Sequence, residues 1–208
     1  MEIPVNHGHL ETIVREPRGS IRGAAIVCHP HPLQGGTMHT KAVFRVAQAL
    51  TEMNIVACRF NFRGVGRSTG SYDGGPGEQQ DAVSTLDWLE EQYPQAPIMA
   101  GGFSFGSMIA LKTGLKDMRV KALFGFGVPV HLYDYSFLAG TKKPTLLIQG
   151  SKDEFGTAEE VQEVVGSLGP RITVVTVPGA DHYFNGAIDQ LKQAVTDYFI
   201  KGPGGGVL

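Results

Sequence analysis

The chain has 208 residues, of which 42% are hydrophobic and 18% charged, with a net charge of −2. This length and composition fit one soluble globular domain with a sizeable core. The near-neutral charge and the absence of a long basic run exclude the usual electrostatic footprint of a nucleic-acid-binding protein. No stretch approaches the roughly 18 apolar residues of a membrane span, so we expect no membrane insertion.

The N-terminal segment and the cysteines indicate a cellular compartment. The opening MEIPVNHGHL has neither the basic region nor the apolar core of a signal peptide. Cys28 and Cys58 each lie inside an apolar run, which favours buried free thiols over a disulfide. We therefore expect a cytoplasmic protein.

The predicted elements begin with a hairpin and continue as alternating strands and helices. IPVNHGHLETIVREP, residues 3–17, predicts a hairpin that turns at Asn6–Gly8. Continuous apolar runs of strand length follow at 23–29, 54–62, 97–103, 121–128, 144–150 and 172–178. Helical periodicity separates them near 43–50, 78–92, 161–168 and 187–200, and directly after residue 104. Such alternation predicts an α/β domain with a mostly parallel sheet and helices on both faces.

The domain is expected to span residues 1–201. The remaining residues, 202–208, read GPGGGVL and are predicted to form a flexible glycine-rich tail.

Two segments match G-x-S-x-G: GRSTG at 66–70 and GFSFG at 102–106. A nucleophilic serine in an α/β sheet needs a strand directly before it and a helix directly after it. Ser104 has both, whereas Ser68 lies between NFRGVG and TGSYDGGPG, which are typical of loops. We therefore predict that Ser104 is the nucleophile and Ser68 a solvated turn residue.

A serine hydroxyl needs a base, and the base needs a carboxylate that orients it. In this architecture the acid and then the histidine follow the serine along the chain. His182 lies between the last predicted strand and the last helix, which suits the base. His131 fits a surface or pocket-wall position.

Asp153 follows the predicted strand at 144–150 and is the preferred acid. Its neighbour Glu154 points another way and is expected in solvent. Asp181 is adjacent to His182 in sequence, and adjacent side chains seldom face each other.

An oxyanion hole requires two backbone N–H groups aimed at the developing charge. Phe105, the residue after the nucleophile, supplies one. The loop CHPHPLQGGT after the first parallel strand should supply the other. Since Pro30 and Pro32 have no N–H, Leu33 is the preferred donor and Gln34 the alternative.

The sequence predicts no metal and no cofactor. His29 and His31 have an H-x-H spacing without nearby carboxylates, and a structural hydrogen-bonding role fits His29 or His31 better than metal ligation. RGVGRSTG lacks the lysine and the following helix of a phosphate-binding loop.

Residues 20–200 resemble a small lidless α/β-hydrolase of the dienelactone-hydrolase-like branch of bacterial carboxylesterases. The resemblance is carried in collinear order by CHPHPLQGGTMHTK, NFRGVGRSTGSYDGGPGEQQDAVSTLDWL, GGFSFGS, IQGSKDEF and PGADHYF. It implies about eight mostly parallel strands, a Ser104–Asp153–His182 triad and an oxyanion hole from Leu33 and Phe105. Dienelactone hydrolases proper carry a cysteine nucleophile, so the serine here disfavours their reaction.

These features predict a serine carboxylesterase that acts on a small-molecule ester through an acyl-enzyme. The same triad serves thioester or amide hydrolysis and acyl transfer, and a non-catalytic binding protein is a further alternative. The protein is expected to be a monomer or a homodimer.

The segment PVHLYDYSFLAGTKK, residues 129–143, is too short for a cap domain, so we expect an open pocket that favours acyl chains of about two to six carbons. The candidate substrate-binding residues are Phe103, Tyr133, Tyr135, Phe137 and Phe184.

Overall fold

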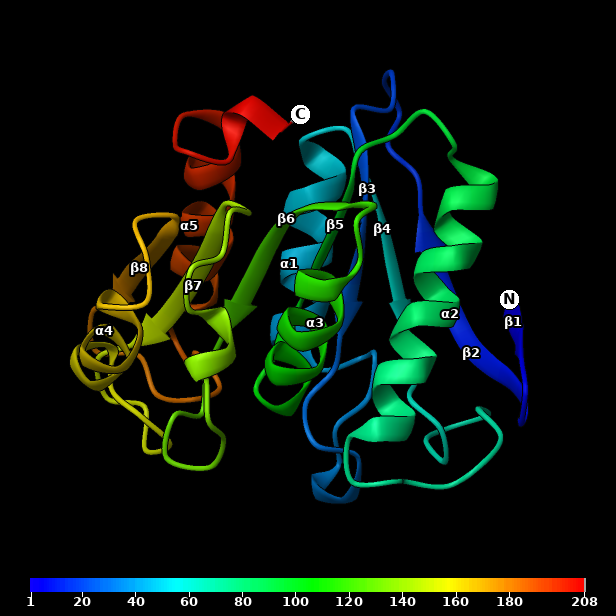
Figure 1. Cartoon of the computed structure of the whole chain (residues 1–208), viewed down its shortest axis with the longest axis horizontal. Helices are drawn as coiled ribbons and strands as arrows, with labels where there is room; N and C mark the ends of the chain where they lie inside the picture. Colours follow the sequence, from blue (N-terminus) through cyan, green and yellow to red (C-terminus); the bar gives the residue numbers. More distant parts are fainter. Residues whose placement is uncertain (208) are drawn as a thin grey trace.

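The computed structural model describes residues 1–207 as an eight-stranded sheet with helices on both faces (Figure 1). The strands lie in the order β1-β2-β4-β3-β5-β6-β7-β8. Their bounds are Glu2–Val5 (β1), Gly8–Arg15 (β2), Gly23–Cys28 (β3), Ile55–Phe60 (β4), Ile98–Phe103 (β5), Val120–Phe126 (β6), Thr145–Gly150 (β7) and Ile172–Val177 (β8). The pairs β1–β2 and β2–β4 are antiparallel, and all the others are parallel.

The N-terminal hairpin has the predicted turn. Val5 pairs with Gly8, so β1 and β2 are joined by a two-residue turn. β2 then pairs with β4, which places the hairpin at one edge of the parallel sheet. The predicted antiparallel start of the sheet is therefore confirmed.

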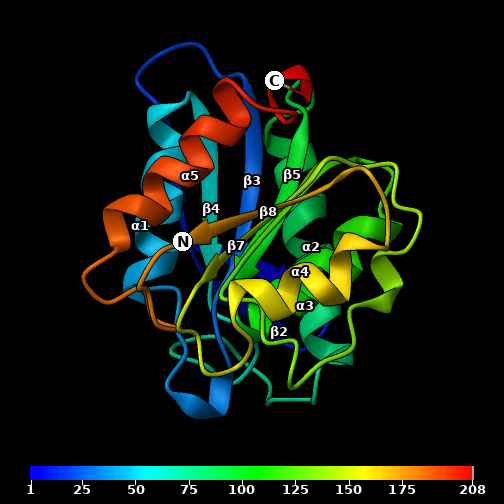
Figure 2. The same ribbon diagram turned by 90° about the vertical axis from the view of Figure 1, so that its left-hand side faces the viewer.

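The helices form two layers, which separate clearly in the view along the sheet (Figure 2). One layer holds α1 (Lys41–Glu52) and α5 (Ile188–Ile200), and the other holds α2 (Pro76–Gln92), α3 (Phe105–Lys116) and α4 (Ala158–Gly166). Because strand side chains alternate, Ile26 of β3 packs under α2 and α3, while its neighbour Val27 packs under α1. Both faces of the central strands are therefore buried, as their continuous apolar runs predict.

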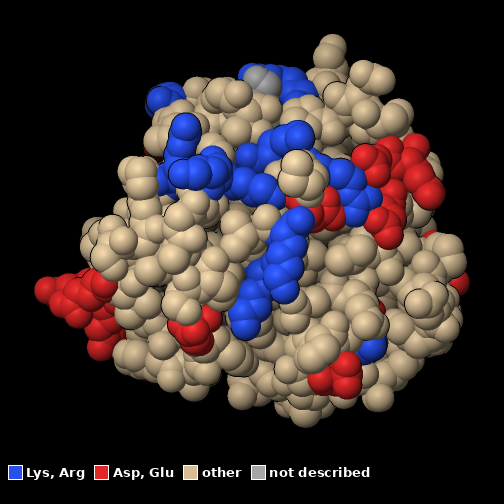
Figure 3. All heavy atoms as spheres, in the orientation of Figure 1, with Lys and Arg blue, Asp and Glu red and all other residues tan. Residues whose placement is uncertain are grey.

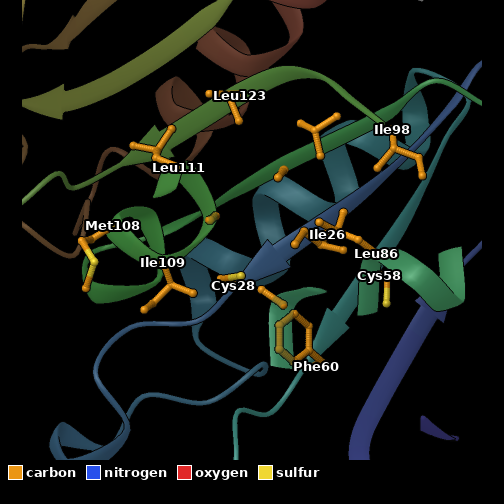
Figure 4. Packing of buried hydrophobic residues seen from close by; sticks show 14 of the residues in the cluster. Ile26, Cys28, Cys58, Phe60, Leu86, Ile98, Met108, Ile109, Leu111 and Leu123 are labelled. Atoms are coloured by element: carbon orange, nitrogen blue, oxygen red, sulfur yellow. The ribbon is translucent and has the colours of Figure 1, made fainter. Parts of the chain in front are cut away.

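Figure 4 shows the cluster beneath α2 and α3, where Cys28 and Cys58 lie among Ile26, Phe60 and Leu86. Both cysteines are free and buried, as expected. Burial raises the pKa of Cys58 to about 12, so this thiol behaves as a small apolar side chain.

The segment between β6 and β7 contains only a short 3-10 helix, Ser136–Leu138, so no cap domain covers the carboxyl ends of the strands. Beyond α5, Gly205–Val207 form another 3-10 helix, and Val207 packs against the α1–α5 cluster. The flexibility of this tail and the domain boundary at 201 stay predictions. Within residues 1–207, no helix is long and apolar enough to cross a membrane.

Basic side chains gather across the face that carries α2, α3 and α4, with acidic ones at its margins (Figure 3). Lys116 ends α3, Lys121 belongs to β6, and Lys143 lies just before β7. Lys143 donates to the carbonyl oxygens of Gly114 and Asp117, and Lys121 donates to that of Met118. The basic surface thus lies towards the amino ends of the strands.

His29 joins the carboxyl ends of β3 and β4 through both ring nitrogens. Nδ1 donates to the Pro30 carbonyl oxygen at 2.7 Å, and Nε2 accepts from the Phe62 N–H at 3.0 Å. These partners define a neutral imidazole, which confirms the expected structural role. Burial lowers its pKa from 6.5 to about 4.

This pKa shift predicts a loss of stability in acid. Between about pH 6.5 and about pH 4, His29 is protonated in the unfolded chain but neutral in the folded chain. Because the unfolded state binds this extra proton, the free energy of unfolding falls by about 3 kcal/mol as the pH drops through this range. Urea unfolding across this range measures the fall. His29→Gln, which cannot titrate, should lack this part of the slope, and an unchanged slope would contradict the assignment.

Candidate active site

Ser104 occupies a strained turn between β5 and α3. Its φ of 54° and ψ of −123° lie in a region that side chains rarely adopt. The strand ends at Phe103 and the helix begins at Phe105, as the motif predicts. A Cβ on Gly106 would collide with the carbonyl oxygens of Cys28 and His29, and one on Gly102 with that of Gly106. Only glycine therefore lets strand and helix approach closely enough to hold this turn.

Ser104, His182 and Asp153 form one continuous hydrogen-bonded chain at the carboxyl ends of the strands. The distance from Ser104 Oγ to His182 Nε2 is 3.0 Å, and that from His182 Nδ1 to Asp153 Oδ2 is 2.8 Å. His182 and Asp153 are each 2% exposed. The structure thus brings together the three residues singled out in the sequence, and they come from loops after β5, β7 and β8.

A network around the Asp153 carboxylate fixes its orientation. Oδ1 accepts from the Phe155 N–H at 2.9 Å, and Oδ2 accepts from Gln149 Nε2 at 2.9 Å. Gln149 Oε1 in turn accepts from the Val128 N–H at 2.6 Å. Sequence reasoning missed Gln149, although a glutamine inside the apolar run TLLIQG was a signal of a buried amide that needs specific partners.

Glu154 and Asp181, the two other candidate acids, accept hydrogen bonds from groups other than the His182 ring. The Glu154 side chain is exposed and accepts from the His182 backbone N–H at 3.4 Å, not from its ring. Asp181 accepts from the backbone and side chain of Asn185. The ring nitrogens of His182 instead bond to Asp153 and Ser104.

Ser68 departs from its expected environment. It is buried rather than solvated, and its hydroxyl donates to the Asn61 carbonyl oxygen at 2.7 Å and accepts from the Glu11 N–H at 2.8 Å. The hairpin packs over this loop and excludes water, which turn chemistry alone could not reveal. Ser68 is therefore a structural residue.

A small cavity of about 190 Å³ opens beside Ser104 and His182. No Lys, Arg, Asp or Glu contributes to its wall within residues 1–207. Besides Ser104 and His182, the wall consists of Pro30, His31, Gln34, Gly35, Gly36, Thr40, Leu132, Phe155 and Tyr183.

The aromatic residues proposed from sequence do not line this cavity. Phe103, Tyr135 and Phe184 are fully buried, and Tyr133 and Phe137 are half-buried. The expectation is corrected because Tyr133, Tyr135 and Phe137 pack on the core beneath α3, while Phe103 and Phe184 pack in the cluster of α1 and α5. Of the 129–143 segment, Leu132 reaches the cavity wall.

Two of these aromatic residues support the site from behind. The Phe103 ring lies 5.0 Å from the His182 ring. Tyr135 Oη lies 3.0 Å from Ser107 Oγ, which donates to the Ser104 carbonyl oxygen. Leu132, Phe155 and Tyr183 take the wall positions instead, and no spacing pattern distinguished them in advance.

The loop after β3 forms a short 3-10 helix, Pro32–Gln34, capped by His31. The Leu33 N–H donates to His31 Nδ1 at 3.2 Å, and the Gln34 N–H donates to the His31 carbonyl oxygen at 3.0 Å. Both expected donors are thus engaged within the loop. The N–H groups of His31 and Phe105, by contrast, make no hydrogen bond to any of residues 1–207.

The remaining histidines fit structural or surface roles. His131 is exposed and pairs with Glu160 at 3.1 Å, and His39 is exposed. Across residues 1–207, no cluster of three or more histidine, cysteine or acidic side chains could hold a metal ion.

Comparison with known proteins identifies the family. Residues 25–194 match the alpha/beta hydrolase domain, and the chain belongs to this family. An uncharacterized protein of Rickettsia prowazekii is 36% identical over 185 residues, covering 85% of this chain and 78% of its own.

Two solved structures are similar over nearly their whole length. An α/β serine hydrolase homologue from Coxiella burnetii is 37% identical with a TM-score of 0.89, covering 94% of each chain. A lidless α/β serine hydrolase from Xanthomonas campestris is 32% identical with a TM-score of 0.89, covering 97% of this chain and 93% of that one. The expected resemblance to small lidless α/β-hydrolases is confirmed.

The close approach at the Ser104 turn predicts a large cost for a single methyl group. Gly106→Ala forces a Cβ against two backbone carbonyls and should lower the unfolding free energy by about 3 kcal/mol. Gly179→Ala is the control, because its Cβ meets nothing within 4 Å and its φ of 74° costs only about 1 kcal/mol. If denaturant titrations show equal losses of unfolding free energy for the two variants, the close contact of Gly106 with the Cys28 and His29 carbonyls does not constrain the turn.

Proposed function

We propose that this protein is a serine carboxylesterase for uncharged, short-acyl esters. The observation that carries the proposal is the chain from Ser104 Oγ through the His182 ring to Asp153, beside a small cavity. A cavity wall without a charged Lys, Arg, Asp or Glu side chain favours a neutral substrate, because it offers no partner to an ionised group.

In the proposed reaction, His182 Nε2 accepts the Ser104 proton as Oγ attacks the ester carbonyl carbon. The tetrahedral intermediate collapses, and the alcohol departs with the proton that His182 returns. Water, deprotonated by the same nitrogen, then attacks the acyl-enzyme and releases the acid. Asp153 keeps Nδ1 protonated and stabilises the imidazolium, so the free nitrogen faces the serine.

The oxyanion hole of this proposal differs from the one expected from sequence. Phe105 keeps its place as one donor. The Leu33 N–H is committed to His31 Nδ1, so we assign the second donor to the His31 N–H. His31 lines the cavity and lies two residues after His29, whose carbonyl oxygen packs against Gly106 at the start of α3. This contact brings the loop next to the N–H of Phe105.

Mutation of the two serines tests the nucleophile. Ser104→Ala should reduce turnover of a soluble p-nitrophenyl ester by about 10⁶-fold and abolish labelling by a fluorophosphonate. Ser68→Ala is the control, because it removes two structural hydrogen bonds far from the reacting atoms in the proposal and should keep most of the activity. Equal losses in both variants would refute the assignment. Thioester and amide analogues of the same acyl group, run in parallel, test the preference for esters.

The cavity volume predicts a narrow range of acyl chains. At roughly 30 Å³ per water-sized group, 190 Å³ holds about six non-hydrogen atoms. Turnover of a homologous ester series should therefore peak at acyl chains of about two to six carbons, because further methylenes project into solvent and gain no burial. Rates that keep rising towards about twelve carbons, or a jump at the solubility limit of the ester, would show a deeper or covered site.

A further inference from the structure

The glycine-rich segment 63–75, RGVGRSTGSYDGG, has no part in the proposed acyl chemistry, yet two buried carboxylates hold it firmly. Asp81 accepts from the Arg63 backbone N–H at 2.8 Å and from its guanidinium at 2.8 Å. Glu78, fully buried, accepts from the N–H groups of Asp73 and Gly75 at 3.0 and 2.7 Å. Both carboxylates belong to the first turns of α2. The segment is thus a fixed support.

This support presents Tyr72 to the loop that follows β3. The Tyr72 hydroxyl lies 3.1 Å from His31 Nε2, and the two ring centroids are 5.0 Å apart. Since His31 Nδ1 accepts from the Leu33 N–H, Nε2 carries the proton and donates to the tyrosine oxygen. Partial burial lowers the pKa of His31, which favours this neutral form. Both ring nitrogens are therefore engaged, and the imidazole has one orientation.

The same two rings pack on the residue after the nucleophile. The Phe105 ring centroid lies 5.1 Å from that of His31 and 6.0 Å from that of Tyr72. One three-ring cluster thus joins the two residues whose N–H groups form the proposed oxyanion hole. Movement of the His31 ring would move the backbone donor next to it.

We propose that Tyr72 is a positioning residue, which through His31 holds the loop 31–36 in the geometry that stabilises the oxyanion. The proposal rests on the proposed esterase function. Tyr72 does not line the cavity, and its hydroxyl hydrogen-bonds to His31 and not to Ser104. Its effect must therefore pass through the imidazole.

An interaction that places an oxyanion donor contributes to the transition state and not to ground-state binding. Loss of the Tyr72 hydroxyl should therefore lower kcat and leave KM nearly unchanged. Removing a whole donor costs about 10²- to 10³-fold. Because loosening a donor costs less than removing it, we expect Tyr72→Phe to lower kcat by about 10- to 100-fold.

The first experiment compares Tyr72→Phe with Tyr93→Phe. Tyr93→Phe also removes one hydroxyl hydrogen bond, the one that Tyr93 donates to Glu16 at 2.6 Å. Tyr93 lies at the C-terminal end of α2 and does not line the cavity. Steady-state kinetics with a short-acyl ester, well below the melting temperature of each variant, should show the fall in kcat for Tyr72→Phe alone. Equal kcat values in the two variants, or a raised KM with unchanged kcat, would overturn the proposal.

A double-mutant cycle tests whether the effect passes through His31. Tyr72→Phe should change kcat in the wild-type background and have no effect in a His31→Phe background, where the hydrogen bond is already lost. Independent, additive effects would overturn the proposal. Fluorophosphonate labelling of the wild type separates the two levels of inference: an unlabelled, inactive wild type refutes the esterase function, whereas a labelled, active one with silent Tyr72→Phe refutes only the positioning role.

Discussion

The site depends on the close approach of α3 to the end of β3. Glycine at 102 and 106 lets the backbones meet without a Cβ between them, and this contact holds Ser104 at a positive φ. The turn lifts the hydroxyl out of the sheet at the carboxyl ends of the strands, where His182 reaches it from the loop after β8. The backbone strain at Ser104 is offset by the burial of β5 and α3 on either side. Because both elements are fixed by this packing, Ser104 can adopt no other conformation.

Buried polar side chains fix the loops around Ser104 in the same way. His29 joins the ends of β3 and β4, Gln149 orients Asp153, and the carboxylates of Glu78 and Asp81 hold the glycine-rich segment. Each of these polar side chains is buried with its hydrogen-bond partners inside the protein. A lidless site has no closing domain to complete its geometry, so preorganisation of this kind must come from the fixed loops themselves.

The shape and the charge of the molecule divide its surface into two regions. Basic side chains gather on the α2–α3–α4 face towards the amino ends of the strands (Figure 3), whereas the cavity at the carboxyl ends has no charged Lys, Arg, Asp or Glu in its wall within residues 1–207. Its small volume and its wall without charged Lys, Arg, Asp or Glu side chains limit the size and the charge of a group that can reach Ser104. This restriction is the basis for proposing a short, uncharged acyl group.

The sequence by itself determined the α/β class, the order of strands and helices, and the separation of Ser104 from Ser68. These features follow from local patterns: apolar runs, helical periods, and a G-x-S-x-G motif that either has or lacks a strand before it. The same logic singled out Asp153 and His182, because chain order in this architecture limits the candidates. Only the tertiary structure decided that Ser68 is buried, that Phe103, Tyr135 and Phe184 belong to the core, and that the Leu33 N–H is committed to His31. The first two outcomes depend on contacts between segments far apart in the chain, such as that of Glu11 with Ser68. The third is a local bond, but it depends on the orientation of the His31 ring, which Tyr72 contacts from 41 residues further along the chain. Local sequence carries no record of such long-range contacts.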